Sequence, residues 1–126
     1  MLAKTFNIVE LKIKSSQIGK FKLIFKYISM RVIAKRTIRN YIAQHPDCEQ
    51  ALLTWHKEAK AAKWKSPSDI KLKYPTASII NNNTVVFNLK GNHYRLIIKI
   101  NYSLFIIWIK FIGTHSHYDK IDVTKI

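Results

Sequence analysis

The chain has 126 residues, enough for one compact domain, and its 22 Lys and Arg against 7 Asp and Glu give a formal net charge of +15. A hydrophobic share of 48% argues against disorder, and a single cysteine excludes an internal disulfide framework. The three glycines form neither a Walker A loop nor a GxGxxG fingerprint, so we expect no nucleotide cofactor. Such a charge excess favours nucleic acid, an anionic membrane or an acidic protein as partner.

Residues 1–29 form a lysine-rich segment with six Lys and one Glu. Their apolar residues come in short bursts, unlike the continuous apolar stretch of a signal peptide. Because ordinary domain patterning begins at Met30, we expect that translation starts there and that residues 1–29 are an upstream extension; a functional basic arm is the alternative. Residues 30–126 are the predicted domain, where 16 basic and 6 acidic residues leave a net charge of +10.

The most apolar run, residues 100–109, lies between Lys99 and Lys110. Its ten residues fall short of the roughly 20 that a membrane-spanning helix needs, and its Ile, Phe and Trp content is typical of a buried strand. Together with the single cysteine, which fits a reducing compartment, this predicts a cytoplasmic protein that contacts no membrane.

The part of the chain before Pro75 is predicted to be mainly helical. Residues 31–34 fit a short strand, and residues 35–44 fit a helix that ends before Pro46. A second helix follows, with a buried apolar stripe at spacings of four and three: Cys48, Leu52, Trp55, Ala59 and Ala62. Residues 66–69 then start a short helical turn.

After Pro75 the sequence predicts strands joined by short turns. Residues 77–80 are apolar, and strands are expected at 84–90, 93–101 and 104–112. Turns this short make consecutive strands antiparallel neighbours. We therefore predict an α+β domain with two N-terminal helices packed on one face of a small antiparallel sheet.

Strand alternation places four basic side chains on the sheet face away from the helices: Lys90, Arg95, Lys99 and Lys110. Any half-exposed sheet must carry polar residues on its solvent side, so a merely solvated face is the simple alternative. Every charge in these three strands is positive, however, which favours a phosphate-binding surface. His93, beside the Gly91-Asn92 turn, is a weaker candidate for RNA contact.

The densest reactive cluster is residues 113–119, directly after the last strand. We expect a loop here, in which His115 and His117 share a face and, with Tyr118, can transfer protons. Cleavage of RNA by its own 2′-hydroxyl needs a base, an acid and a cation such as Arg95, and it needs no metal. A metal site at the two histidines is an alternative, although no cysteine accompanies them, and so are two plain surface histidines.

Six stretches of the chain together resemble the HigB toxins of the RelE/ParE superfamily of type II toxin–antitoxin systems. They are Met30-Arg-Val-Ile-Ala-Lys-Arg-Thr, His45-Pro-Asp, Trp64-Lys-Ser-Pro, Val86-Phe-Asn, Gly91-Asn-His-Tyr-Arg-Leu and Gly113-Thr-His-Ser-His-Tyr-Asp-Lys-Ile-Asp. The resemblance runs in order from Met30 to Ile126, and its last stretch is the most specific.

The resemblance implies a RelE-like mRNA interferase that cleaves translated messages, usually on the ribosome, and a HigA-like antitoxin with a helix-turn-helix domain. Its motifs point to Arg95, His115 and Tyr118, with Lys90 and Lys99 supporting phosphate binding. Similar sequences commonly have Glu where this chain has His117, so His117 ranks below His115.

We therefore predict a metal-independent endoribonuclease toxin in which the 2′-hydroxyl attacks the adjacent phosphate. His115 is the general acid or base, Arg95 stabilises the transition state, Tyr118 transfers or positions a proton, and His117 is a further catalytic candidate. The residues predicted to bind RNA are Lys90, Lys99, Lys110 and His93. The net charge predicts an acidic antitoxin. Two alternatives remain: a ParE-like inhibitor of a protein target such as gyrase, and a plain RNA-binding module.

Overall fold

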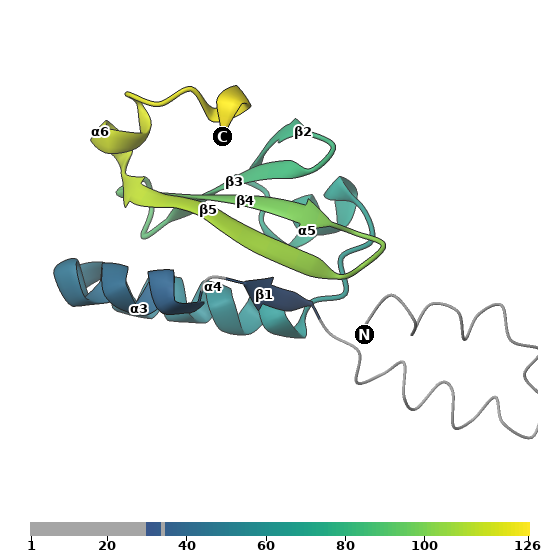
Figure 1. The fold of residues 1–126 in the computed structure, drawn as a ribbon, viewed down its shortest axis with the longest axis horizontal. Coiled ribbons are helices and arrows are strands. Elements are labelled where there is room, and N and C mark those ends of the chain that lie inside the picture. The colour runs from purple at the N-terminus through teal and green to yellow at the C-terminus, as the bar shows by residue number, and fades with distance from the viewer. Residues whose placement is uncertain (1–29, 34) are drawn as a thin grey trace, which may run out of the picture.

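The computed structural model describes residues 30–33 and 35–126, and the predicted extension at 1–29 lies outside these described residues. In the described part, three layers stack in space (Figure 1): helices, a sheet, and the C-terminal segment. The α+β class and the two helices on one face of the sheet are confirmed.

The sheet has five strands in the spatial order β1-β5-β4-β3-β2. They are β1 (Arg31–Ile33), β2 (Ser78–Asn81), β3 (Thr84–Leu89), β4 (Tyr94–Asn101) and β5 (Ile106–Thr114). Strands β2 to β5 pair antiparallel, as predicted for the meander. The short β1 pairs parallel to β5, which makes the sheet mixed instead of wholly antiparallel. This difference arises because the helical segment carries the chain from one edge of the sheet to the other before β2 begins.

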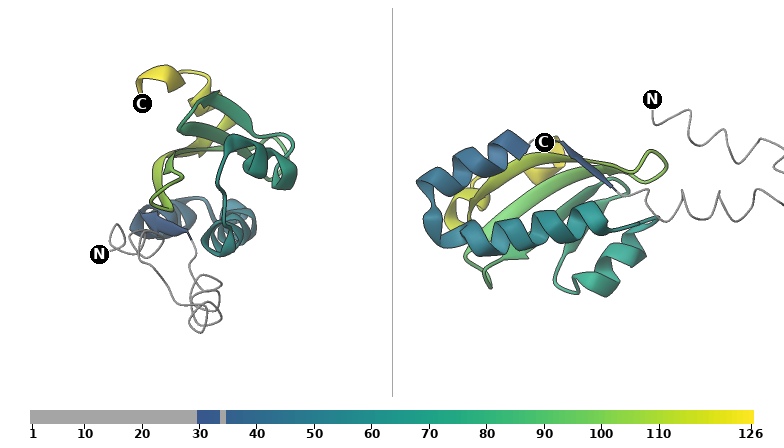
Figure 2. Two further views of the ribbon diagram at one scale, coloured as in Figure 1. Left: turned by 90° about the vertical axis from the view of Figure 1, so that its right-hand side faces the viewer. Right: turned by 90° about the horizontal axis from the view of Figure 1, so that it is seen from below.

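The helical segment comprises α3 (Lys35–Gln44), the 3₁₀ turn η3 (Pro46–Cys48), α4 (Glu49–Ala61) and α5 (Pro67–Lys73). Figure 2 shows α3 and α4 side by side under the same face of the sheet. Most of the predicted stripe is buried there, namely Cys48, Leu52, Trp55 and Ala59, while Ala62 is partly buried; the Trp55 and Phe87 ring centres are 5.4 Å apart. Helix α5 begins where Ser66 Oγ accepts a hydrogen bond from Asp69 N, as its sequence predicts.

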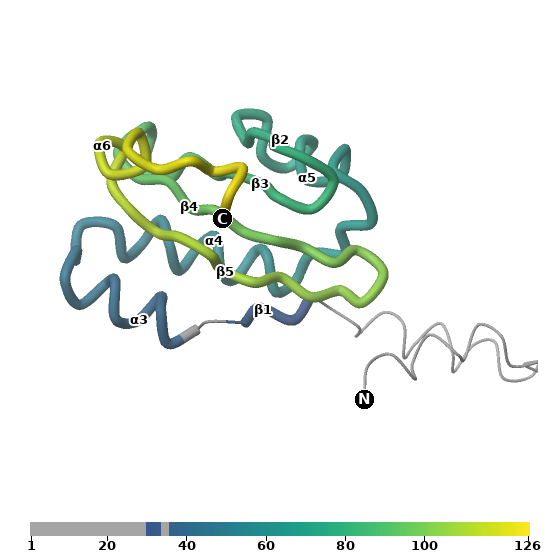
Figure 3. The backbone as a smooth tube through the Cα atoms, turned by 45° about the horizontal axis from the view of Figure 1, so that its top comes forward, coloured from purple at the N-terminus to yellow at the C-terminus, as the bar shows by residue number. Residues whose placement is uncertain are grey.

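The opposite face of the sheet is less open than alternation predicts. The residues on either side of Val86 and Ile97 along their strands belong to the helix-side core. Side chains alternate between the two faces of a sheet, so Val86 and Ile97 point away from the helices. Both are nevertheless buried. The chain after α6 runs back across this face (Figure 3) and ends in the 3₁₀ turn η4 (Val123–Lys125). The face away from the helices, predicted to be basic, therefore also carries the buried apolar side chains of Val86 and Ile97.

Strand β5 continues to Thr114, two residues beyond its predicted end, and passes directly into the one-turn helix α6 (His115–Tyr118). The predicted loop at residues 113–119 is therefore wrong in conformation. The helix has a local cause: Thr114 Oγ1 accepts a hydrogen bond from His117 N at 3.2 Å, as an N-cap residue does.

Candidate functional site

The pairing of β4 with β5 sets the position of α6. Tyr94 lies opposite Thr114 and Arg95 lies opposite Gly113 in the ladder. One further backbone bond extends it, because His115 N donates to His93 O at 2.9 Å. The first residue of α6 is thus held beside the start of β4, although some twenty residues separate the two in sequence.

Arg95 and His115 are in direct side-chain contact. Arg95 Nη2 lies 3.1 Å from His115 Nδ1. The second terminal nitrogen of the guanidinium, Nη1, donates to the carbonyl oxygens of Asn92 at 2.9 Å and Tyr94 at 3.3 Å. In the free protein, hydrogen bonds to the turn before β4 therefore orient the guanidinium, and a permanent cation lies against the imidazole.

Tyr118 joins this pair from the same side of α6. Successive helical residues are about 100° apart, so side chains three apart lie on nearly the same side. The guanidinium carbon of Arg95 is 5.7 Å from the centre of the Tyr118 ring, within cation–π range. A cation, an imidazole and a phenol therefore meet at one place.

The other imidazole nitrogen of His115 faces a carboxylate. His115 Nε2 lies 3.3 Å from Asp119 Oδ2, and both side chains are about half exposed. Asp119 N also donates to His115 O at 3.1 Å, which closes the helical turn. Both ring nitrogens of His115 thus have partners, and the ring is accessible from solvent.

A cavity of about 460 Å³ opens beside His115. Its lining comes from η3, from the turn before β4 and from the β5–α6 junction: Asp47, Asn92, His93, Tyr94, Thr114, His115 and Ser116. Most of these residues present polar groups, as a site for a polar ligand requires.

Asp47 also lines this cavity and is hydrogen-bonded to two residues of the β3–β4 region. The Tyr94 hydroxyl lies 2.7 Å from both carboxylate oxygens of Asp47, and Lys90 Nζ lies 3.2 Å from Oδ2. The hydrogen bond from Tyr94, assisted by Lys90, lowers the pKa of Asp47 below its usual value. The same bond raises the pKa of Tyr94 to about 12, since it favours the protonated phenol.

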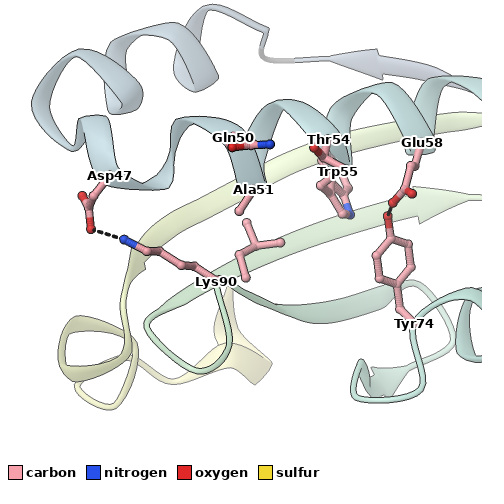
Figure 4. A pocket seen from close by; sticks show the side chains of 9 residues that line it. Asp47, Gln50, Ala51, Thr54, Trp55, Glu58, Tyr74 and Lys90 are labelled. Atoms are coloured by element: carbon pink, nitrogen blue, oxygen red, sulfur yellow. Dashed lines mark hydrogen bonds and ion pairs between the residues drawn. The ribbon is translucent and has the colours of Figure 1, made fainter.

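Lys90 does not lie on the face away from the helices, and that prediction is wrong. Its backbone has a φ of 50°, which ends the strand alternation, and its side chain reaches Asp47 on the helix side (Figure 4). Lys90 lines a second cavity, of about 410 Å³, between α4 and the sheet. Trp55 and the hydrogen-bonded pair Tyr74 and Glu58 line the same cavity.

His117 does not join the site. The prediction that it shares a face with His115 assumed an extended segment, and in the helix α6 the two side chains point in different directions. The His117 ring packs edge to face on Phe111, with ring centres 5.3 Å apart. The site therefore contains His115, not both histidines.

Lys99 and Lys110 lie outside the contact formed by Arg95, His115 and Tyr118. Lys99 is on the same face of β4 as Arg95, four residues away, which corresponds to roughly 13 Å of strand. Lys110 is exposed at a register shift in β5 and has no cross-strand partner, so alternation does not assign its side. Neither lysine has an ion-pair partner among residues 30–33 and 35–126. His93 contributes its carbonyl to α6 and lines the cavity.

Sequence reasoning placed Asp119 in the reactive cluster but gave it no role, and it missed Asp47 and Asn92 as members of this region. Asp119 had a usable signal, because it lies four residues after His115, the spacing of a helical ion pair. Asp47 had none, because its contact with Tyr94 joins positions 47 residues apart.

Across the part of the chain that the structure describes, three or more His, Cys, Asp or Glu side chains nowhere gather as a metal site would require. In the same part, no helix combines the length and apolar character needed to cross a bilayer.

Comparison with known proteins identifies similar sequences. Residues 48–121, more than half of the chain, match the HigB toxin family model, described as the RelE-like toxic component of a toxin-antitoxin system. The chain is also similar to the mRNA interferase HigB of Escherichia coli O6:H1, strain CFT073. The two are 24% identical over 94 residues, which cover 73% of this chain and 91% of that protein.

Proposed function

This chain belongs to the HigB toxin family, the RelE-like toxic components of toxin–antitoxin systems, and from that premise we propose that it is an endoribonuclease that cleaves messenger RNA. The matched segment includes β4, β5 and α6, which carry Arg95, His115 and Tyr118. Its similarity to an mRNA interferase along most of both chains supports the same activity.

The observation that carries the proposal is the 3.1 Å contact between Arg95 and His115, since His115 also lines an accessible cavity. When RNA supplies its own 2′-hydroxyl as nucleophile, the enzyme needs a proton acceptor, a cation near the phosphate and a proton donor. His115 is the general acid or base, Arg95 binds the phosphate and stabilises its developing charge, and Tyr118 transfers or positions a proton. No step of this reaction calls for a metal ion.

We assign the RNA path to His93, Lys99 and Lys110. His93 borders the cavity, and Lys99 continues along β4 from Arg95 on the same face. Lys110 adds an exposed cation on β5. Such side chains neutralise backbone phosphates without reading sequence, which fits a nuclease that accepts many messages.

A toxic component of a toxin–antitoxin system has a cognate antitoxin as its partner. The net charge of +15 favours an acidic antitoxin surface. A HigA-like antitoxin with a helix-turn-helix domain, a translating ribosome as the place of cleavage, and the cytoplasm as the compartment complete the proposal.

The test uses the purified protein, ribosomes programmed with a short message, and analysis of the RNA ends. We expect a 5′-hydroxyl on the downstream fragment and a 2′,3′-cyclic or 3′-phosphate on the upstream one. A message with a 2′-deoxy nucleotide at the cleavage position should resist cleavage there, because the nucleophile is missing. Intact messages in several codon contexts would overturn the proposal, and early arrest of DNA replication with intact messages would favour a gyrase-type target.

A further inference from the structure

The imidazole of His115 is held from both sides by groups of opposite charge. Arg95 Nη2 faces Nδ1 at 3.1 Å, and Asp119 Oδ2 faces Nε2 at 3.3 Å. Arg95 comes from β4, and Asp119 follows the last residue of α6. The ring therefore bridges a strand and a helix end.

These two partners define where the proton of the neutral ring lies. A guanidinium has only donors, so Nδ1 must present its lone pair to Arg95. An ionised carboxylate has only acceptors, so Nε2 must carry hydrogen toward Asp119. A neutral imidazole satisfies both contacts only as the tautomer protonated on Nε2.

We propose that Asp119 is the positioning residue of the site: it holds His115 with hydrogen on Nε2, so that Nδ1, beside Arg95, is the nitrogen that accepts the proton of the 2′-hydroxyl. The inference rests on the proposed function and assigns a residue and a nitrogen atom to it. Asp119 touches neither the RNA nor the reacting atoms, and acts through His115.

Arg95 then links substrate binding to the availability of this base. In the free protein its Nη2 occupies the lone pair of Nδ1. A phosphate that draws the guanidinium onto its own oxygens frees this lone pair at the moment when the 2′-hydroxyl arrives. The imidazole thus becomes available as a base when the phosphate is bound.

The proton and bond changes balance without a further reactant. The 2′ oxygen gives its proton to Nδ1 as its bond to phosphorus forms and the bond from phosphorus to the 5′ oxygen breaks. The leaving 5′ oxygen takes a proton from Tyr118 or from water. The imidazolium of His115 then gives its extra proton to the tyrosinate or hydroxide that this leaves. During the first step the Asp119 carboxylate faces the positive ring and stabilises it.

The groups around His115 that carry charge or titrate come from each element packed against it. Arg95 belongs to β4 and His93 to the turn before it, while Tyr118 and Asp119 belong to α6 and its end. Asp47 lines the same cavity and is already bonded to Tyr94 and Lys90. Asp119 is thus the acidic side chain in contact with the imidazole.

The first test reads the tautomer directly, without activity. Nitrogen-15 NMR of the full chain, at a pH where the ring is neutral, should show His115 with hydrogen on Nε2. Because Arg95 alone also favours hydrogen on Nε2, the effect of Asp119 is read in the Arg95→Ala background. Adding Asp119→Ala there should give a mixture of both tautomers, whereas adding the matched Asp122→Ala should leave the tautomer unchanged. Hydrogen on Nδ1 in the wild type, or an unchanged tautomer on adding Asp119→Ala, would overturn the proposal.

The second test separates positioning from folding. In Asp119→Asn, which keeps the side-chain shape, we expect kcat for RNA cleavage to fall about 3- to 10-fold with little change in KM, since the lost pair is half exposed. The acidic limb of the rate profile should move to lower pH, because the negative charge beside the imidazole is lost. An unchanged kcat and pH profile in Asp119→Asn would overturn the role of Asp119 but not the proposed nuclease activity. A wild-type protein that shows the expected tautomer but cleaves no RNA would instead overturn the proposed function.

Discussion

Arg95 and Gly113 lie directly opposite each other in the β4–β5 ladder, and Gly113 is glycine for a steric reason. A Cβ atom added there would lie 2.4 Å from Cζ of the Phe111 ring, closer than such contacts occur. The ring of Phe111 thus lies over the backbone of Gly113, two residues before His115. Gly113 therefore contributes both to the strand pairing that positions the Arg95 guanidinium and to the packing that positions α6.

Gly113→Ala should therefore disturb the site as well as the fold. Phe111 must move, and we expect the free energy of unfolding to fall by about 1–3 kcal/mol, the usual cost of overpacking. Urea denaturation measures this effect, and RNA cleavage should also fall because α6 shifts. Gly91→Asn is the control, since nothing lies within 4 Å of an added Cβ there and Asn tolerates its φ of 66°. Equal stability of the two variants would contradict this explanation.

The helical conformation of α6 predicts that its two histidines differ in importance. His115→Ala should lower the cleavage rate roughly 10²–10⁴-fold, as loss of a general acid or base does. His117→Ala should lower it less than about threefold, because His117 packs on Phe111 and makes no contact with Arg95. Single-turnover cleavage of the same message compares them. Comparable losses in both variants would show that the extended arrangement predicted from the sequence operates during catalysis.

The Asp47–Tyr94 bond predicts opposite effects at the two ends of the pH scale. The lowered pKa of Asp47 contributes stability that is fully present above the ordinary carboxyl pKa and is lost as pH falls through the lowered value. The raised pKa of Tyr94 contributes stability that is fully present below the ordinary phenol pKa, near 10, and is lost as pH rises through about 12.

Ultraviolet titration of phenolate formation measures the second effect. Subtracting the curve of Tyr94→Phe isolates Tyr94, which should ionise near pH 12 in the wild type. In Asp47→Asn its midpoint should move down toward the ordinary value, since an amide lacks the carboxylate charge. A midpoint that is the same in Asp47→Asn as in the wild type would refute the role given to this bond.

Lys99 should contribute to RNA affinity through charge alone. If it contacts one phosphate, Lys99→Ala should lower the slope of log affinity against log salt by about 0.7 for single-stranded RNA. The loss should be similar for different sequences. Lys57→Ala, on the exposed side of α4, is the charge-matched control and should leave the slope unchanged. Equal slopes for wild type and Lys99→Ala would remove Lys99 from the RNA path.

Local signals in the sequence predict much of this fold. The apolar stripe through Leu52 and Trp55 identifies α4, Ser66 identifies the start of α5, and Gly91 with its φ of 66° identifies the β3–β4 turn. Each depends on neighbours within one turn of chain, where spacing and residue type act directly.

The features that sequence reasoning missed depend on distant pairings. The three residues of β1 pair with a strand more than seventy residues later, and nothing in their own pattern selects that edge or direction. The strand alternation of side chains is interrupted at Lys110 by a register shift and at Lys90 by a left-handed backbone. Alternation therefore does not predict the side of the sheet for these two of the four cations. The motif resemblance identified Arg95, His115 and Tyr118, but their contacts follow from the β4–β5 register.

Whether Arg95 and His115 act on one phosphate is tested most directly by a double-mutant cycle of RNA cleavage. Arg95→Ala, His115→Ala and the double variant are compared in single-turnover reactions on the same message. Groups that act as a unit are strongly non-additive, so the double variant should be little slower than the slower single variant. Losses that multiply independently, or full cleavage by the double variant, would contradict a shared site.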